Sequence, residues 1–399
     1  MSSSEGRTRR EILADTAKLA AAASLSGLAG CFPGVGGSWP LCKESDGGAN
    51  GYAGVPPRVT PAVVEVNRPE SVIKYVIQPD VVASMLDAGL AALANQVKLF
   101  NAGGAAQDGG ADTAEAEAPE SDGGTGNPWT VLLPNYKAGQ SIGLKVNCLN
   151  PFGVTTSPAL IRAIVASLHD NLGVDPGNIF VWDRFLTDLE NNGKLSSDAV
   201  GGAKLIGTLL RGLNSGESED DSNITAGHGF GDPICSAPIG VAMSGQTARY
   251  PRLSRILTKE TALTISCPVF KSHNISGVSG AMKNIYGMID NPEQYHQPNL
   301  FTDLPKLYAL PDIRNRVSLI ICDALVGILL GDPAARANCQ PGRILLAQDP
   351  VAIDSYVRDA MDEIQASQHM GSVDRTATTW LENAEAAGLG TTKYSLYQA

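Results

Sequence analysis

Two kinds of apolar pattern alternate along the chain and predict its elements. Nearly continuous apolar runs of strand length predict buried strands at 141–148, 178–183, 261–267, 317–323 and 343–347. Apolar residues at helical spacing predict helices at 82–98, 158–171, 351–361 and 377–387. The first two strands and the helix between them form a βαβ unit, which makes the two strands parallel. We therefore expect an α/β fold with mostly parallel sheets and flanking helices, built on βαβ units.

The pattern is less regular in other parts of the chain. Residues 71–77 are expected to be a short strand or an extended segment, and 276–286 a glycine-broken segment that ends in a helix. Residues 193–213 are expected to contain a helix, and 253–259 to be helical.

The N-terminal segment has the pattern of a targeting signal. Residues 8–13 (TRREIL), with Arg9 and Arg10, resemble a twin-arginine export signal, and an alanine-rich apolar stretch follows. That stretch ends in 28–31 (LAGC), which resembles a bacterial lipobox and implies lipidation of Cys31. The resemblance implies the twin-arginine export machinery as a partner, a lipid anchor as the only link to the membrane, and a place on the periplasmic or cell-envelope side. The alternative is an ordinary amphipathic helix that stays attached.

The remaining chain is expected to have three parts. Residues 31–68, rich in Gly and Ser at their start, are expected to form a flexible tether after the signal at 1–30. An α/β domain is expected over 69–365, interrupted at 103–126 by a disordered insertion with six acidic and no basic residues. A C-terminal helical extension is expected over 366–399.

Composition excludes several classes of function. The net charge is −11 with 30 basic residues, which argues against a nucleic-acid partner. There is no second long apolar stretch after the N-terminal one, so a multi-span membrane protein is excluded. The seven cysteines include no C-x-x-C pair, so the sequence has no iron–sulfur or zinc-ribbon motif.

Polar residues follow the first two predicted strands, where ligands of parallel sheets bind. Lys145 and Asn147 come at the end of the first strand, and Thr155 and Thr156 stand before a helix N-terminus. Hydroxyls and free backbone N–H groups at that position predict an anion-binding site, and simple helix capping is the alternative for the two threonines. Asp183 ends the second strand and is a candidate catalytic residue.

The segment after the third strand is the densest in candidate chemistry. It contains Lys271, His273, Lys283 and Asn284 among three glycines, which let the backbone approach a ligand closely. Lysine suits a carboxylate or phosphate, or covalent attachment when desolvated, and histidine suits acid–base work. We take His273 and Lys283 as candidate catalytic residues and Lys271 and Asn284 as ligand-binding residues. A surface ion pair is the alternative for Lys271.

Two further residues are candidates for the same site. His296, in 291–296 (NPEQYH), could close onto it. Asp349 starts a helix as its N-cap, but Asp354, one turn later, lacks such a structural reason. Asp354 is therefore expected to face the ligand.

The order of these motifs resembles the domain-of-unknown-function family 362, over about residues 70–365. The matching pieces are 143–147 (GLKVN), 155–158 (TTSP), 267–273 (CPVFKSH), 277–284 (GVSGAMKN) and 349–354 (DPVAID). This resemblance implies no settled activity.

A lysine ten positions after a histidine, across a Gly-Val-Ser-Gly run, is also similar to the nickel-pincer lactate racemase family. That resemblance implies that Lys283 tethers a nickel-pincer-type nucleotide, that His273 is an acid–base residue and that His296 binds the metal. The family places another histidine near the end of its second strand, where this chain has Asp183 and Arg184. This departure argues against a two-histidine racemisation and leaves the cofactor open.

Three functions fit these observations. The first is an exported enzyme that acts on a small anion, either isomerase- or racemase-like or redox, with a bound cofactor or metal. The alternative is a non-catalytic envelope lipoprotein that binds an anionic ligand or a metal. A structural or assembly factor, with the dense segment serving packing, is the third.

Overall fold

The computed structural model of the chain describes residues 59–103, 126–210, 228–242, 247–296 and 298–399. The predicted export signal with Arg9 and Arg10, the lipidation residue Cys31, the tether as far as residue 58 and nearly all of the acidic insertion lie outside these residues.

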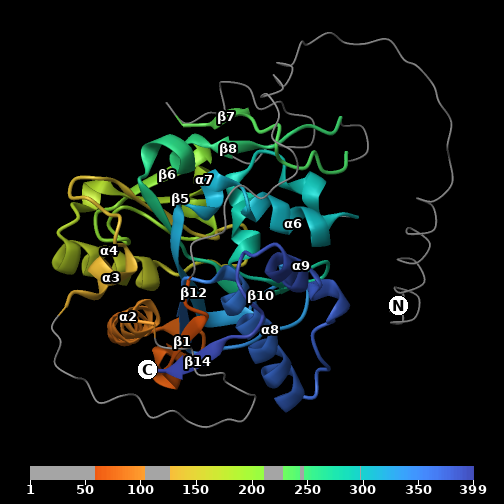
Figure 1. The fold of residues 1–399 in the computed structure, drawn as a ribbon. Helices are drawn as coiled ribbons and strands as arrows, with labels where there is room; N and C mark the ends of the chain where they lie inside the picture. The colour runs from red at the N-terminus through yellow and green to blue at the C-terminus, as the bar shows by residue number, and fades with distance from the viewer. Residues whose placement is uncertain (1–58, 104–125, 211–227, 243–246, 297) are drawn as a thin grey trace, which may run out of the picture. The chain divides into compact units, whose positions relative to one another are not determined.

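A ten-stranded, mostly parallel sheet is the centre of the described chain (Figure 1). Its main path has the order β14-β1-β13-β12-β9-β4-β5-β6, and β10 and β11 extend it beside β12. All neighbours from β12 to β6 are parallel, whereas β13 is antiparallel to both β12 and β1. This arrangement confirms the predicted α/β class. The strands are β1 (Ala62–Asn67), β4 (Ile142–Lys145), β5 (Ile179–Phe185), β6 (Lys204–Leu209), β9 (Leu263–Ser266), β10 (Val269–His273), β11 (Gly277–Ser279), β12 (Val317–Ile328), β13 (Arg343–Ala347) and β14 (Ser395–Gln398).

The direction of winding reverses between β4 and β9. From β4 the chain moves outward to β5 and β6, then returns to the other side of β4 to form β9 and β12. In such doubly wound sheets the crossover connections leave on opposite faces at this point, and a crevice opens beyond the strand ends. The carboxyl ends of β4 and β9 border that point, so the fold itself selects the region where a ligand would bind.

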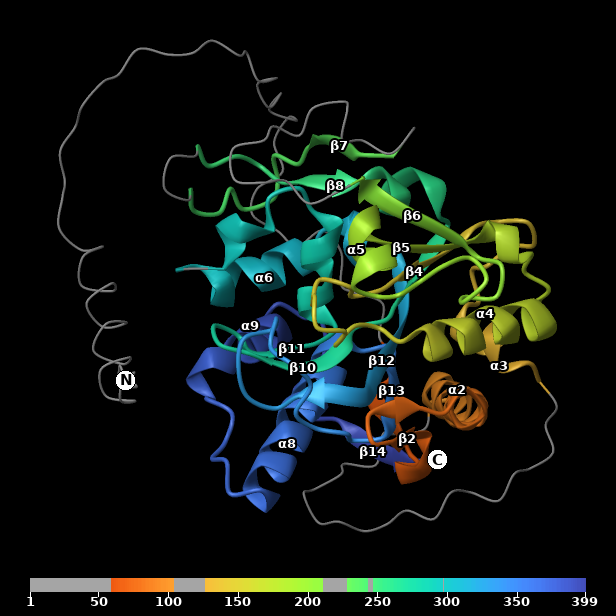
Figure 2. The ribbon, with the colours of Figure 1, turned by 180° about the vertical axis from the view of Figure 1, so that it is seen from behind.

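Helices cover both faces of the sheet, and each face has its own apolar core. Along β12, Leu319 and Ile321 belong to one core, whereas Ile320 and Cys322 belong to the other, as the two-residue period of a strand requires. The first core takes its helical residues from α2 (Pro79–Asn101), α3 (Pro128–Leu132), α4 (Pro158–Leu172) and α5 (Leu186–Asn191). The second takes them from α6 (Leu300–Tyr308), α7 (Pro311–Arg314), α8 (Pro350–Ser367) and α9 (Trp380–Ala386). Figure 2 shows α2, α3 and α4 gathered together, away from α6, α8 and α9.

Burial on both faces explains the unbroken apolar runs that predict the strands. In β12 and β13 both sets of alternating side chains are largely apolar and buried, so these strands show no alternating pattern. In β4 and β9 one face is apolar and the other carries small or polar buried residues. The helices follow the expected positions, because Pro158 and Pro350 stand at their first turns and Ser157 and Asp349 cap them.

Short elements complete the described fold. They are the hairpin strands β2 (Val72–Ile73) and β3 (Val76–Ile77), the pair β7 (Phe230–Pro233) and β8 (Arg252–Ser254), the π-helix η4 (Ile256–Glu260), and the 3₁₀ helices η1 (Pro69–Ser71), η2 (Pro176–Asn178), η5 (Met282–Met288), η6 (Pro292–Tyr295) and η7 (Thr376–Thr378). Within the described ranges no helix is both long and apolar enough to cross a bilayer.

Four expectations need correction. The helix expected within 193–213 is instead the strand β6, and the segment 253–259 divides between β8 and η4. The expected end of the tether at residue 68 lies too far along the chain, because β1 at Ala62–Asn67 is a buried strand paired on both sides. The C-terminal 366–399 segment is not a purely helical extension, since it adds the edge strand β14 to the main sheet. In each case pairing within the sheet outweighs the local pattern.

Candidate functional site

Most of the predicted site residues lie together beyond the carboxyl ends of β4, β5 and β10. The helix η5 lies against these strand ends and supplies Lys283 and Asn284, and His296 follows η6 directly. Lys271 and His273 are two positions apart on β10, so their side chains leave the same face of the strand. The fold therefore gathers residues from 145 to 296 into one cluster of lysine, histidine and asparagine side chains.

Lys145 and Asp183 form a buried ion pair at the base of this cluster. Lys145 Nζ lies 2.8 Å from Asp183 Oδ1, and its side chain is 1% exposed. The other carboxylate oxygen of Asp183 accepts a hydrogen bond from the Cys148 N–H. Lys145 Nζ also donates to the Val146 carbonyl at 2.6 Å. Both partners are thus satisfied within the protein, which makes the pair a fixed element of the site rather than an open pair of reactive groups.

A network of amides joins this pair to Lys271. Asn284 Nδ2 donates to the Lys145 carbonyl and to Ser266 Oγ, so η5 is held against the ends of both β4 and β9. Asn147 Nδ2 lies 3.5 Å from Asn284 Oδ1, and Asn147 Oδ1 accepts a hydrogen bond from Lys271 Nζ at 2.9 Å. Asn284 therefore holds η5 in position against the strand ends, whereas Asn147 contacts the second buried lysine, Lys271.

Lys271 is a buried cation whose hydrogen-bond partner is neutral. The residue is 1% exposed, and among the described residues Asn147 is the one hydrogen-bond partner of Nζ. Burial lowers the pKa of Lys271 to about 8, although the carboxylate of Asp183 acts against this shift. At pH 7 the ammonium form still predominates. A buried charge normally requires a counter-charge, so Lys271 is the group best placed to take an anion.

His273 and Lys283 form the second buried contact of the cluster. His273 Nε2 lies 2.9 Å from Lys283 Nζ, and His273 Nδ1 accepts hydrogen bonds from the backbone N–H groups of Ile275 and Ser276. Burial is the main cause that lowers the pKa of His273 to about 2, followed by the charge of Lys283. Burial also holds the pKa of Lys283 well below its ordinary value, and the charge of Lys271 acts in the same direction.

His296 closes the cluster on the far side of His273. The two imidazole rings are stacked, with centroids 5.6 Å apart, and Tyr286 meets the His296 ring edge-on at 4.9 Å. His296 Nδ1 lies 3.0 Å from the Pro292 carbonyl, so Nδ1 carries a proton and the other ring nitrogen is an acceptor. Burial lowers the pKa of His296 to about 4. His296 is therefore a neutral base at pH 7, and it does lie beside the predicted site.

The carboxylate of Asp354 holds η5 in place, and two glycines without side chains allow η5 to pack closely against its neighbours. Asp354 accepts hydrogen bonds from the backbone N–H groups of Ala281 and Met282 at 2.6 and 2.9 Å, and its residue is 0% exposed. A Cβ on Gly280 would lie 1.9 Å from Asp354 Oδ1, and a Cβ on Gly287 would lie 2.5 Å from Lys145 Nζ. The structure thus places Asp354 behind η5, where it positions the helix instead of facing a ligand. This corrects the expected ligand-binding role.

The predicted anion site at the N-terminus of α4 is filled by protein groups. Thr156 Oγ1 donates to the Cys267 carbonyl and accepts from the Asn147 N–H, so this buried hydroxyl fastens the end of β4 to that of β9. Ser157 caps α4, and its own N–H donates to Asp323 Oδ2. Thr156 is accordingly a structural link rather than a ligand-binding residue, and the cap is one position later than the threonines. Thr155 is partly exposed, and its role stays a prediction.

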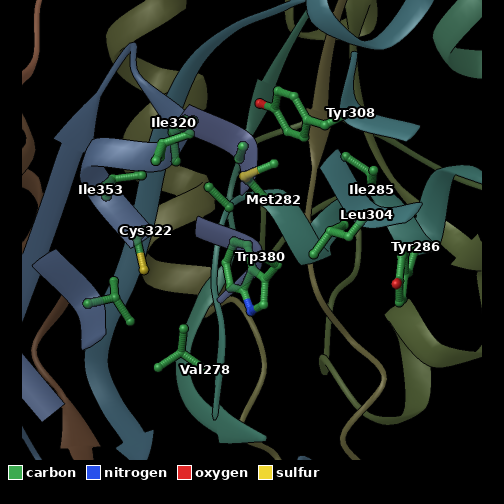
Figure 3. Close-up of a cluster of buried hydrophobic side chains, with 14 of the residues drawn as sticks. Val278, Met282, Ile285, Tyr286, Leu304, Tyr308, Ile320, Cys322, Ile353 and Trp380 are labelled. Atoms are coloured by element: carbon green, nitrogen blue, oxygen red, sulfur yellow. The ribbon is translucent and has the colours of Figure 1, made fainter. Parts of the chain in front are cut away.

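The opposite side of η5 is apolar and anchors it in the second core. Figure 3 shows Met282 and Ile285 among Leu304, Tyr308 and Trp380, with Tyr286 at the edge of the group. The Trp380 indole N–H donates to the Ser276 carbonyl, next to the turn that holds His273. Packing on one side and polar contacts on the other leave η5 little freedom to move.

A metal held by protein side chains alone does not fit this cluster. Across the described ranges no group of three or more His, Cys, Asp or Glu residues could hold a metal ion. His296 offers one acceptor nitrogen, whereas His273 Nε2 is engaged with Lys283. A site with so few ligands departs from the four-coordinate and six-coordinate arrangements of protein metal centres. His296 as a nickel ligand, and Lys283 as the tether of a nickel-pincer-type nucleotide, stay predictions.

Two residues of the dense segment, Tyr286 and Gly287, contribute to the site in ways that the sequence does not indicate. Tyr286 packs against His296 and lies under Lys283, whose Nζ is 4.9 Å from the centroid of its ring. Its hydroxyl donates to the Tyr295 carbonyl at 2.6 Å and so joins η5 to η6. Gly287 gives the room for Lys145. Both residues belong to the dense segment, but they lack the charged or titratable character at pH 7 that draws attention to their neighbours.

Comparisons with known proteins give a family match for part of the chain. The comparison with curated proteins finds no match. A crystal structure of a protein from Thermotoga maritima matches 59% of this chain at 10% identity, with a TM-score of 0.33, and the match spans 56% of that protein's length. A likeness at that level carries no argument about fold or function. Residues 239–359, which include β10, η5 and the start of α8, match the model of the family described as Domain of unknown function (DUF362).

Proposed function

We propose that this protein binds a small anionic ligand at the cluster of Lys271, His273, Lys283 and His296, and that it acts on that ligand as an enzyme. The observation that carries the proposal is Lys271, a buried cation whose hydrogen-bond partner among the described residues is an amide. Among the described residues, the carboxylates whose charges act on Lys271 are Asp183, which is already paired with Lys145, and Asp332, and neither accepts a hydrogen bond from Lys271 Nζ. A carboxylate or phosphate of a ligand would supply the missing counter-charge.

The neighbouring groups favour an enzyme over a purely binding protein. A site that only captured anions would gain from keeping every lysine and histidine charged. Here burial holds His273 and His296 neutral and holds the pKa of Lys283 well below its ordinary value. Neutral imidazole and amine groups beside one cation suit proton transfer and nucleophilic chemistry on a bound anion. An isomerase- or racemase-like reaction uses such groups directly. A redox reaction would need an electron carrier in addition.

A thermal-shift experiment tests the binding half of this proposal. Ligands that bind the folded state raise its stability by about 2.7 kcal/mol at a hundred times Kd. We expect one of the small carboxylates lactate, pyruvate and oxalate, or inorganic phosphate, to raise the thermal midpoint of the full chain. Lys271→Met should abolish the shift, and Lys306→Met, at an exposed position on α6, should retain it. Equal shifts in both variants, or none in the unmodified protein, would refute the proposal.

The catalytic half has its own test. The protein is incubated in D₂O with the carboxylate that gives the thermal shift, and exchange of the hydrogen next to the carboxylate is followed by NMR. Exchange that depends on His273 and His296 supports proton transfer at the site. Binding without any chemical change supports the alternative, a non-catalytic envelope lipoprotein that binds an anionic ligand.

We also propose that the chain is exported and lipid-anchored on the periplasmic or cell-envelope side. The N-terminal twin-arginine and lipobox motifs carry this proposal. Cell fractionation tests this proposal. The double variant Arg9→Lys, Arg10→Lys should retain the protein in the cytoplasm, and Cys31→Ala should release it from the membrane fraction. Unchanged membrane association in both would refute it.

A further inference from the structure

The hydrogen bonds around His273 fix where its proton lies. The backbone N–H groups of Ile275 and Ser276 can only donate, and both donate to His273 Nδ1, at 3.1 and 3.4 Å. Nδ1 is therefore an acceptor without a proton. A neutral imidazole then carries its single proton on Nε2. The tight turn that follows β10 thus determines the tautomer of the ring.

This tautomer determines the state of Lys283. His273 Nε2 lies 2.9 Å from Lys283 Nζ, and with its proton in place Nε2 is the donor of that hydrogen bond. The acceptor must offer a lone pair. An ammonium group has three protons and no lone pair, whereas a neutral amine has one. The geometry consequently requires Lys283 to be a neutral amine in the folded protein.

The surroundings of Lys283 agree with this requirement. The groups that face it are His273 and Lys271 from β10, Tyr286 from its own helix and His296 after η6. Burial and the charge of Lys271 both disfavour an ammonium group at Lys283. The imidazoles of His273 and His296 are neutral. The face of the Tyr286 ring favours a cation, but this attraction is weaker than the cost of a buried, unpaired charge. Among the described residues no carboxylate contacts Lys283 Nζ.

We propose that Lys283 is a nucleophilic amine that forms an imine with a small carboxylate bearing an aldehyde or ketone group, of the 2-oxo acid class. This inference rests on the proposed function, because Lys271 would hold the carboxylate while Lys283 meets the carbonyl carbon. In the reaction the amine nitrogen forms a bond to the carbonyl carbon, and the carbon–oxygen double bond is replaced by a carbon–nitrogen double bond. The two amine protons leave with the carbonyl oxygen as water, so no oxidant or reductant is needed.

The position of the cluster suits this reaction. Lys271 and His273 leave the same face of β10, and Lys283 Nζ contacts His273 there, so carboxylate and carbonyl would be held by neighbouring groups. Asn147 and His296 are partly exposed, so the cluster borders the surface at these two residues. An amine that is already neutral needs no base to activate it, unlike an exposed lysine, which is protonated at pH 7.

Reductive trapping tests the proposal. The full chain is incubated at pH 6 with pyruvate and cyanoborohydride, which reduces an imine to a stable secondary amine, and the adduct is located by intact mass and peptide mapping. Surface lysines are almost fully protonated at pH 6 and react slowly. We expect one adduct, on Lys283, that is absent in Lys283→Arg. The control Lys306→Arg, at an exposed position, should keep the adduct.

A second probe separates this proposal from the proposed function. Acetone carries a ketone group like that of pyruvate but has no charge. Pyruvate should label Lys283 about tenfold faster than acetone at equal concentration, as a charge-assisted contact with Lys271 would give, and Lys271→Met should lose this preference. If pyruvate raises the thermal midpoint in a Lys271-dependent manner but leaves no adduct, Lys283 is not a nucleophilic amine and anion binding still stands. Rapid labelling by acetone, with no binding or preference for any carboxylate, overturns the proposed function and the substrate class. Adducts spread over surface lysines overturn the inference.

Discussion

The ion pair of Lys145 and Asp183 gives the sharpest prediction about the stability of the site. At 2.8 Å and an effective dielectric constant of about 20, the attraction between the two charges is about 6 kcal/mol before desolvation is counted. In Asp183→Asn the amide would replace one carboxylate oxygen with an N–H donor. That donor would face either Lys145 Nζ or the Cys148 N–H, both of which are donors themselves. The substitution therefore leaves a buried ammonium group without a counter-charge and one donor without an acceptor.

We predict that Asp183→Asn lowers the free energy of unfolding by about 3–5 kcal/mol, the usual cost of removing one partner from a buried pair. At roughly 2–4 °C per kcal/mol, the thermal midpoint should fall by roughly 6–20 °C. Urea denaturation followed by circular dichroism and tryptophan fluorescence measures the change.

Two controls show whether burial of the charge is the cause. Asp312→Asn removes the acidic partner of Arg316, but its side chain is 56% exposed and the charged atoms are 3.7 Å apart, so stability should change by less than about 0.5 kcal/mol. The double variant Lys145→Met, Asp183→Asn removes the stranded charge and should be more stable than Asp183→Asn alone. The reasoning is refuted if Asp183→Asn costs no more than Asp312→Asn, or if the double variant recovers nothing.

Three further predictions concern the helix η5 and the histidines. Gly287→Ala should destabilise the protein by about 1–3 kcal/mol, because its Cβ would lie 2.5 Å from a buried lysine nitrogen, whereas Gly231→Ala, with 3.6 Å to its nearest neighbour, should have little effect in the same urea titration. Asp354→Ala should lower the free energy of unfolding by about 2–4 kcal/mol, because it leaves two buried N–H groups without acceptors. It should also slow the trapping of Lys283 by pyruvate, and normal trapping would contradict the positioning role. The pKa of His296 is about 4 in the folded state and near 6.5 in the unfolded chain. Between these pH values the unfolded chain binds more protons than the folded protein. The contribution of His296 to the free energy of unfolding therefore falls as the pH drops from about 6.5 to 4. The difference between wild type and His296→Gln in unfolding free energy should shrink over that range, and a constant difference would contradict the assignment.

The sequence was sufficient to predict the strands β4, β5, β9, β12 and β13 and to indicate which candidate residues lie near one another. Strands buried on both faces are continuous apolar runs, and they are hard to confuse with loops. Parallel strands end at the same edge of a sheet, so Lys145 and Lys271 could be expected to lie near each other. These inferences need only local patterns and the geometry common to all parallel sheets. The strand β10 was not predicted, and only in the structure does the two-residue spacing of Lys271 and His273 place them on one face of a strand.

The roles of single polar residues depended on contacts that no local pattern encodes. Asp354 lies one turn into α8, where a helix gives no reason for a carboxylate, and its actual partners are N–H groups more than 70 positions earlier. Thr156 looks like a helix cap or an anion ligand, but its hydroxyl joins the ends of two strands. β6 and β1 were missed for a related reason. Each borders or completes a sheet whose other strands lie elsewhere in the chain, and pairing with them decides the conformation.

The pairing of β1 has a consequence for how the chain reaches its folded state. Within the described residues β1 pairs only with β13 and β14, so Val64 lies between Leu346 and Tyr397. Its partners are synthesised some hundreds of residues after it, and such distant pairings fold slowly. Until residues 395–398 emerge from the ribosome, one edge of β1 lacks its strand and offers open backbone groups to other chains. The sheet is therefore complete on this side of β1 only after residues 395–398 have been synthesised.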